Sequence, residues 1–108
     1  MRILFDQATP VPLRRFLSGH SVSTAAQQGW DELRNGDLLK AAEDDGFEVL
    51  LTTDQNMQYQ QNLSTRKIAI VVLGKGNWPL IEPHVQLVVA AVNAAAPGTF
   101  AEVDIPFA

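Results

Sequence analysis

The chain has 108 residues, of which 46% are hydrophobic and 19% are charged, and its mean hydropathy is 0.00. This balance is typical of an ordinary globular domain and excludes a disordered tail or a fibre, so we expect a single domain over residues 1–108. Eight Lys and Arg residues against twelve Asp and Glu residues give a formal net charge of −4. Bulk charge therefore does not attract nucleic acid, and any such binding needs a local basic patch.

The sequence contains no Cys, which excludes disulfides, thiolate metal sites and cysteine nucleophiles. Without disulfides or a signal peptide, the sequence predicts a cytoplasmic protein. The longest apolar runs are far shorter than a bilayer span, so no membrane partner is expected.

Strands and helices alternate along the predicted chain. In chain order we expect a strand at 2–5, a helix at 10–18, a weak strand at 20–23, a helix at 35–45, a strand at 48–52, a strand at 68–73, a long helix at 77–96 and an edge strand at 99–105. The polar stretch 55–62 is expected to form a short surface helix or a loop. Two of the strands are continuous runs of leucine or β-branched residues, which is typical of strands buried on both faces. The pattern predicts an α/β fold with a mostly parallel central sheet between helices.

Local signals mark the ends of the predicted helices. Thr9 is expected to cap the first helix, with Pro10 at its first position. Gly46 is expected to end the second helix. Asn77 is expected to cap the long helix, which ends at Pro97.

Two acidic residues follow predicted strands: Asp6 after the first and Asp54 after the third. Ligands of open parallel sheets bind beyond the carboxyl ends of the strands, so the two carboxylates converge if these strands are neighbours. Asp37, in the first turn of the second helix, can lean over the same edge. Clustered carboxylates repel one another unless a divalent cation such as Mg²⁺ neutralises them. Asp6, Asp37 and Asp54 are therefore the candidate catalytic residues.

Each of these acids also has a structural interpretation. Asp6 can cap the turn before Thr9, and Asp54 can cap a short helix that follows it. Asp37 lies at a helix start, where the helix dipole favours any acid.

Several segments together resemble the short PIN-like proteins of prokaryotes. The segments are Leu4-Phe5-Asp6, a proline-containing first helix, His20-Ser21-Val22, Gly36-Asp37-Leu38-Leu39 and Val49-Leu50-Leu51-Thr52-Thr53-Asp54-Gln55-Asn56. Such proteins are related to VapC-type nucleases and are often described as toxin-like members of toxin–antitoxin pairs. The resemblance extends from Met1 to about Leu73, and the block from Leu51 to Asp54 is its most specific part.

The resemblance implies a three-layer, Rossmann-like PIN-like fold and a ribonuclease site that depends on Mg²⁺ or Mn²⁺. Asp6 matches the first acid of the family and Asp54 the acid after the later strand, and Asn56 joins them as a metal ligand. The implied partners are an RNA substrate and a small antitoxin-like protein. A second copy of the chain, in a homodimer, is a further expected partner.

The sequence departs from the family pattern at Gln7, Asn35 and Asn56, where family members commonly carry acids. Asp37 can take over from Asn35. Amide oxygens can ligate a divalent ion but carry no charge, and Mg²⁺ gains most from anionic ligands. The alternative hypothesis is therefore a catalytically impaired PIN-like module that binds protein or RNA.

Three basic residues are candidate RNA contacts: Arg14, Arg15 and Lys75. The simpler interpretation is that they form a solvated surface. Trp30 and Trp78 are expected to be core or interface anchors.

A phosphoacceptor receiver domain is a further hypothesis from a different class, because Asp54 ends a central strand. A receiver domain carries an Asp/Glu pair after its first strand, whereas this chain has Asp6-Gln7. A receiver also needs a Lys before a Pro after its fifth strand, whereas Lys75 follows the expected fourth strand.

Overall fold

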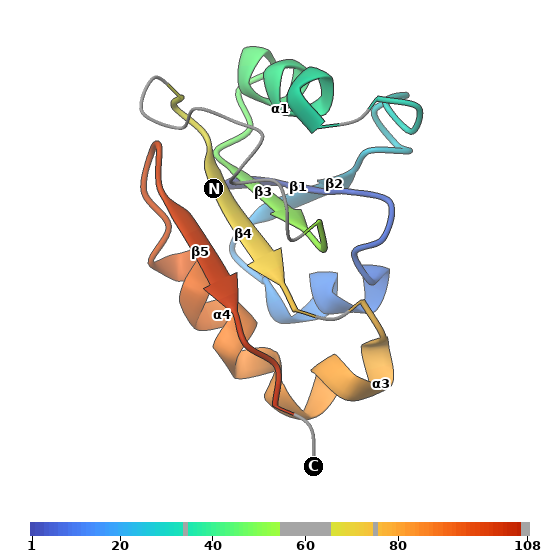
Figure 1. Cartoon of the computed structure of the whole chain (residues 1–108), viewed down its shortest axis with the longest axis vertical. Coiled ribbons are helices and arrows are strands. Elements are labelled where there is room, and N and C mark those ends of the chain that lie inside the picture. The colour runs from blue at the N-terminus through green and yellow to red at the C-terminus, as the bar shows by residue number, and fades with distance from the viewer. Residues whose placement is uncertain (34, 55–65, 75, 107–108) are drawn as a thin grey trace.

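The computed structural model describes residues 1–33, 35–54, 66–74 and 76–106, which contain a five-stranded sheet in which every strand is parallel to its neighbours (Figure 1). The strands are β1 (Arg2–Phe5), β2 (Ser21–Thr24), β3 (Val49–Thr52), β4 (Ala69–Leu73) and β5 (Phe100–Val103). Their order in the sheet is β2-β1-β3-β4-β5. This order is the flavodoxin-like variant of the doubly wound α/β folds.

Helices cover both faces of the sheet and complete a three-layer α/β fold, which confirms the expected fold class (Figure 1). One face is covered by η1 (Val11–Phe16), α3 (Trp78–Ile81) and α4 (Val85–Asn93), and the short η3 (Glu82–His84) links α3 to α4. The opposite face is covered by α1 (Asn35–Asp44).

Alternate residues of each strand face opposite layers. Phe5 and Leu51 pack toward η1 and α4, whereas Leu4 and Leu50 pack toward α1. Every residue of β3 and β4 is buried, because these strands lie inside the sheet and are covered on both faces. This explains the continuous apolar runs in the sequence.

The strand predicted at the carboxyl end is confirmed as an edge strand. β5 pairs with β4 alone among the described strands. Val103 and Ile105 are buried, whereas Glu102 and Asp104 are exposed, as the alternation predicts.

The first helix differs from the prediction. It is a six-residue 3₁₀ helix whose N-cap is Pro10, with no side-chain hydrogen bond at the cap. Thr9 does not cap it, because its hydroxyl lies instead 2.8 Å from Asp6 Oδ1 and 2.9 Å from the Leu51 carbonyl oxygen.

The long helix predicted at 77–96 is wrong as one element. The chain forms α3, then the short η3, then α4, which ends at Asn93. The break coincides with Pro83, which has no N–H to donate and whose ring crowds the preceding turn.

The polar stretch 55–62, including Asn56, lies outside the described residues, as does Lys75. None of the helices in the described part of the chain has the length and apolar character needed to cross a membrane.

Candidate functional site

The site lies at the carboxyl ends of β1 and β3, which are neighbours in the sheet. Phe5 pairs with Leu51, and the pairing continues one residue further, because the Asp6 N–H donates to the Leu51 carbonyl at 3.1 Å. Asp54 follows the end of β3 by two residues. The chain leaves β1 toward β2 on one side and leaves β3 toward β4 on the other. This is the switch point at which doubly wound sheets bind their ligands.

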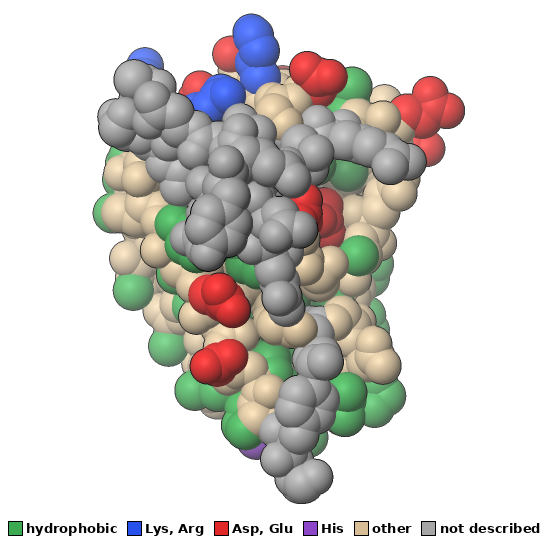
Figure 2. All heavy atoms as spheres, viewed as in Figure 1, with side chains coloured by type: hydrophobic (Ala, Val, Ile, Leu, Met, Phe, Trp, Pro, Cys, Tyr) green, Lys and Arg blue, Asp and Glu red, His purple; other side chains and the backbone are tan. Residues whose placement is uncertain are grey.

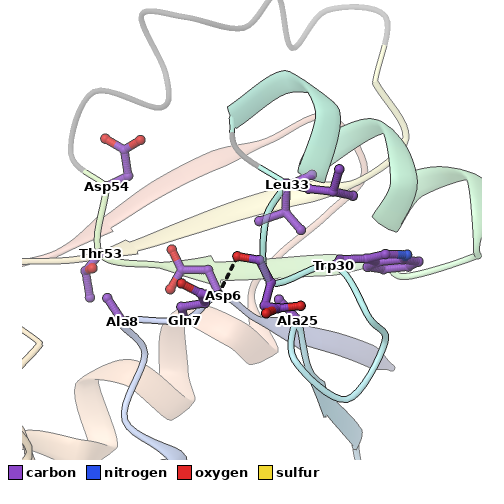
Figure 3. A pocket seen from close by; sticks show the side chains of 10 residues that line it. Asp6, Gln7, Ala8, Ala25, Trp30, Leu33, Thr53 and Asp54 are labelled. Carbon is purple, nitrogen blue, oxygen red and sulfur yellow. Dashed lines mark hydrogen bonds between the residues drawn. The ribbon is translucent and has the colours of Figure 1, made fainter.

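An open pocket of about 410 Å³ occupies this position (Figure 3). It is lined by Asp6, Gln7, Ala8, Ala25, Trp30, Asp31, Leu33, Leu38, Thr53 and Asp54. Figure 3 shows Asp6, Thr53 and Asp54 on one side, and Leu33 and Trp30 on the other. The structure therefore brings Asp6 and Asp54 into one pocket.

Two buried threonines hold the Asp6 carboxylate. The Thr52 hydroxyl donates to Asp6 Oδ2, and the Thr9 hydroxyl lies within hydrogen-bonding distance of Asp6 Oδ1. The Thr52 oxygen also accepts the Asp54 N–H at 3.1 Å. One hydroxyl thus ties the side chain of one acid to the backbone of the other. Each carboxylate oxygen has a second lone pair, so Asp6 can still ligate a cation while it is held.

The turn after β1 supports the structural interpretation of Asp6 as well. The Thr9 N–H donates to the Asp6 carbonyl at 3.2 Å, in addition to the side-chain contact. Asp6 therefore orders the turn that leads to η1 while its carboxylate lines the pocket.

The side chain of Asp54 is oriented differently. In Figure 3 its carboxylate lies beyond Thr53 and points away from Asp6. For both acids to contact one ion, the half-buried Asp54 side chain must adopt another rotamer.

Asp31 is a third acid at the pocket that the sequence analysis did not identify. The Gln7 side chain reaches across from the end of β1 and donates through Nε2 to the Asp31 carbonyl at 2.5 Å. Trp30, the preceding residue, packs edge-on against Phe47 with ring centroids 5.9 Å apart. No sequence spacing indicates this loop, because only the tertiary structure brings it to β1.

The other candidate residues lie elsewhere. Asp37 is exposed in α1 and does not line the pocket, although its neighbour Leu38 does. Arg14 donates to the Val22 carbonyl at 2.6 Å, and Arg15 is exposed on η1; neither lines the pocket. The side chain of Asn35 lies outside the part of the structure that is described.

The pocket is acidic, because three of its lining residues are Asp and none of the described lining residues is Lys or Arg. The basic side chains visible in Figure 2 gather at the α1 end of the molecule. Arg66 precedes β4, so it lies at the amino edge of the sheet, where it pairs with Glu43 at 3.3 Å.

The described lining residues suit a hard cation, since their polar side chains offer carboxylate, amide and hydroxyl oxygens and none of them is Cys, Met or His. Within the described residues, no three or more His, Cys, Asp or Glu side chains are grouped closely enough to hold a metal ion. Mg²⁺ needs no such cage, because it is commonly bound through one or two carboxylates, waters and the phosphates of its substrate.

No family model matches the sequence, and no curated protein or solved structure matches it at a significant level.

Proposed function

We propose that this protein is a metal-dependent ribonuclease of the PIN-like type, acting at the pocket beyond the carboxyl ends of β1 and β3. The observation that carries the proposal is the placement of Asp6 and Asp54, from the ends of adjacent parallel strands, in one acidic pocket. The resemblance of the Leu51–Asp54 block to PIN-like proteins supports the same assignment.

The charge of the pocket supports the need for a metal. A phosphodiester that enters it meets three carboxylates and, among the described lining residues, no basic side chain. We therefore propose that the positive charge comes with a cation. Asp6 and Asp54 would hold Mg²⁺ or Mn²⁺, and the ion supplies activation of water and stabilisation of charge on the phosphodiester.

The contribution of the protein is to place the acids. Thr9 and Thr52 restrain the Asp6 side chain, so less conformational entropy is lost when it ligates. The Asp54 N–H bond to Thr52 sets the backbone from which the second carboxylate projects.

Substitution of the two acids tests the proposal. We expect purified protein with Mg²⁺ or Mn²⁺ to cleave RNA, and Asp6→Asn and Asp54→Asn each to lower the rate by about a hundredfold or more, because a ligand charge is lost. Mg²⁺ should also raise the melting temperature of the wild type but not of Asp6→Asn, since a ligand stabilises only the state that binds it.

The matched control is Asp44→Asn, which removes an exposed carboxylate that pairs with Lys40 in α1. Cleavage that persists in Asp6→Asn, or falls equally in Asp44→Asn, contradicts the assignment.

A second candidate is a PIN-like module that binds RNA or a small protein without hydrolysis. This candidate is favoured by Gln7, which stands at a position where PIN-like proteins commonly have an acid. Its amide donates to the Asp31 carbonyl. Calorimetric titration with Mn²⁺ distinguishes the two, because absence of heat at millimolar metal favours the binding module. The toxin hypothesis adds that a small protein encoded beside this one forms a complex with it and inhibits cleavage.

The receiver hypothesis fits the strand order and the position of Asp54 after β3. The residue before Pro106, after β5, is the buried Ile105, where a receiver needs Lys. Together with Gln7 in place of the second acid, this position disfavours phosphate acceptance.

A further inference from the structure

The outer edge of β5 presents backbone groups that no described strand pairs with. The Thr99 and Val103 carbonyls accept hydrogen bonds at 3.0 and 3.1 Å from β4 and from the residue that follows it. In a trans peptide the N–H points opposite to the C=O, so the N–H groups of Phe100 and Asp104 point away from β4. The N–H of Glu102, between them, points the same way by the alternation of the strand. Three donors therefore face outward along one short edge.

A groove of about 300 Å³ lies beside this edge. It is lined by Leu87 and Ala91 of α4 and by Glu102, Val103 and Asp104. The two α4 residues are four positions apart and so share one side of the helix, and Leu87 is 46% exposed. Charged side chains alone are a common protection of an edge strand against pairing. Protection does not require an exposed leucine beside the charges, whereas a bound strand would cover it.

The charges of the groove favour a basic partner. Val103 is buried toward α4, so Glu102 and Asp104 lie on the opposite face of the sheet, and both are exposed. Figure 2 shows acidic side chains on the β5 side of the molecule, and none of the described residues that line the groove is Lys or Arg. Opposite charges on neighbouring strands attract and like charges repel. A second copy of β5 would bring its own two acids to the same face, so the charges disfavour it.

We infer that the edge of β5 and this groove bind an extended segment of a partner protein in which Lys or Arg alternates with apolar residues. The segment joins the sheet as a further strand, with its apolar side chains over Leu87 and Ala91 and its basic side chains beside Glu102 and Asp104. Pro106 has no N–H, so the open edge is limited to residues 100–104. The surface is separate from the proposed ribonuclease pocket, because β4 lies between β3 and β5.

Synthetic peptides test the sequence pattern of the partner. We expect a fluorescein-labelled heptapeptide in which Lys and Val alternate to bind saturably, as measured by fluorescence anisotropy. The same peptide with Glu in place of Lys should bind at least about tenfold more weakly, because like charges then face each other. A peptide of the same composition with its Lys residues grouped at one end should bind about fivefold more weakly. Equal affinity for the alternating and grouped peptides would show attraction by bulk charge and overturn the inference.

A pair of exposed leucines tests the apolar side of the groove. Leu87→Asp should weaken binding of the alternating peptide about tenfold, because its Val residues lose their apolar contact. Leu80→Asp is the matched control, since Leu80 is 39% exposed on α3 and does not line the groove. The control adds the same charge and should keep at least half of the wild-type affinity. Equal losses in the two variants contradict binding at the groove.

Charge reversal tests the acidic side. The double variant Glu102→Lys/Asp104→Lys should prefer the peptide that carries Glu over the one that carries Lys. The double variant Glu32→Lys/Glu82→Lys changes the net charge equally at exposed positions outside the groove and should keep the preference of the wild type. The same preference in both double variants overturns the inference, because the peptide would then respond to net charge alone.

Amide hydrogen exchange, measured by NMR, distinguishes strand addition from other binding. The alternating peptide should slow exchange at Phe100, Glu102 and Asp104 at least about tenfold and leave Ala101 and Val103, which face β4, nearly unchanged. Saturable binding without this alternating protection overturns the added strand. Protection of the outward amides in the free protein, together with the mass of a dimer, would assign the edge to a second copy and also overturn the inference.

Discussion

Thr52 is the side chain that joins the two candidate acids. It is fully buried, donates to Asp6 and accepts the Asp54 N–H. This buried hydroxyl both donates and accepts a hydrogen bond. Its removal would leave the Asp54 N–H without this acceptor and Asp6 Oδ2 without this donor.

We expect Thr52→Val to lower the free energy of unfolding by about 1–3 kcal/mol and to weaken Mg²⁺ binding. Thr52→Ser keeps the hydroxyl and should keep the metal affinity, with a loss of about 1 kcal/mol for the missing methyl group. Urea unfolding and calorimetric titration measure the two effects. Thr99→Val, which removes a hydroxyl that donates to the Ala96 carbonyl outside the pocket, is the matched hydroxyl control. Equal metal affinity in the Val and Ser variants at position 52 would contradict the positioning role.

Glu43 shows how a single carboxylate in α1 anchors the start of β4. The Lys67 N–H donates to it at 2.6 Å and is the main reason why the pKa of Glu43 lies below its ordinary value of about 4.5. The Ile68 N–H and the Arg66 guanidinium lower it further, and burial opposes them.

Because the pKa of Glu43 is lower in the folded than in the unfolded state, its contribution to stability is complete above about pH 4.5 and is lost as the pH falls through the folded value. Glu43→Gln should cost about 1 kcal/mol at neutral pH and flatten the acid limb of the stability curve. Chemical denaturation between neutral and acid pH measures both. Glu32→Gln, at an exposed position, is the control, and an unchanged acid limb in Glu43→Gln would show that the bonds contribute nothing.

At the scale of elements, the end of α1 is determined by one glycine. Gly46 has a φ of +88°, and a Cβ at this position would lie 3.1 Å from Arg2 Nη1. That guanidinium bonds Asp45 and lies 4.2 Å from the Phe47 ring centroid. The turn therefore needs a residue without a side chain for both conformational and steric reasons.

We expect Gly46→Ala to destabilise the protein by about 1–2 kcal/mol from the backbone conformation alone, and by roughly 0.5 kcal/mol more because Arg2 must move. Gly29→Ala is the matched control, since its φ is +78° and a Cβ there meets no atom within 4 Å. Thermal unfolding of the two variants gives the difference. A smaller loss in Gly46→Ala than in Gly29→Ala would contradict the role of Arg2.

The helix boundaries show where local signals succeed and fail. Gly46 ends its helix as predicted, because a positive φ is a property of the residue itself. Thr9 looks like an N-cap in the sequence, but its hydroxyl contacts Asp6 and Leu51 across the sheet edge. Pro83 is visible in the sequence, and its missing N–H and its ring are enough to interrupt the helix that the apolar pattern on either side predicts.

At the scale of the whole molecule, the order β2-β1-β3-β4-β5 creates the site. It makes β1 and β3 neighbours although 43 residues separate the last residue of β1 from the first of β3, counting residues 6–48. The carboxyl ends of both strands then share one edge, and the acids that follow them share one pocket.

The alternation of apolar runs with helical patterns was enough to predict a parallel sheet between helices, because burial on both faces imposes its own composition. The candidate acids were also visible, since parallel strands present the residues after their carboxyl ends at one edge. The position of Asp31, the Gln7 bond to its carbonyl and the engagement of Asp6 by two threonines were decided by tertiary structure alone. These contacts join residues from different loops and strands, and no local preference of the chain encodes which of them meet.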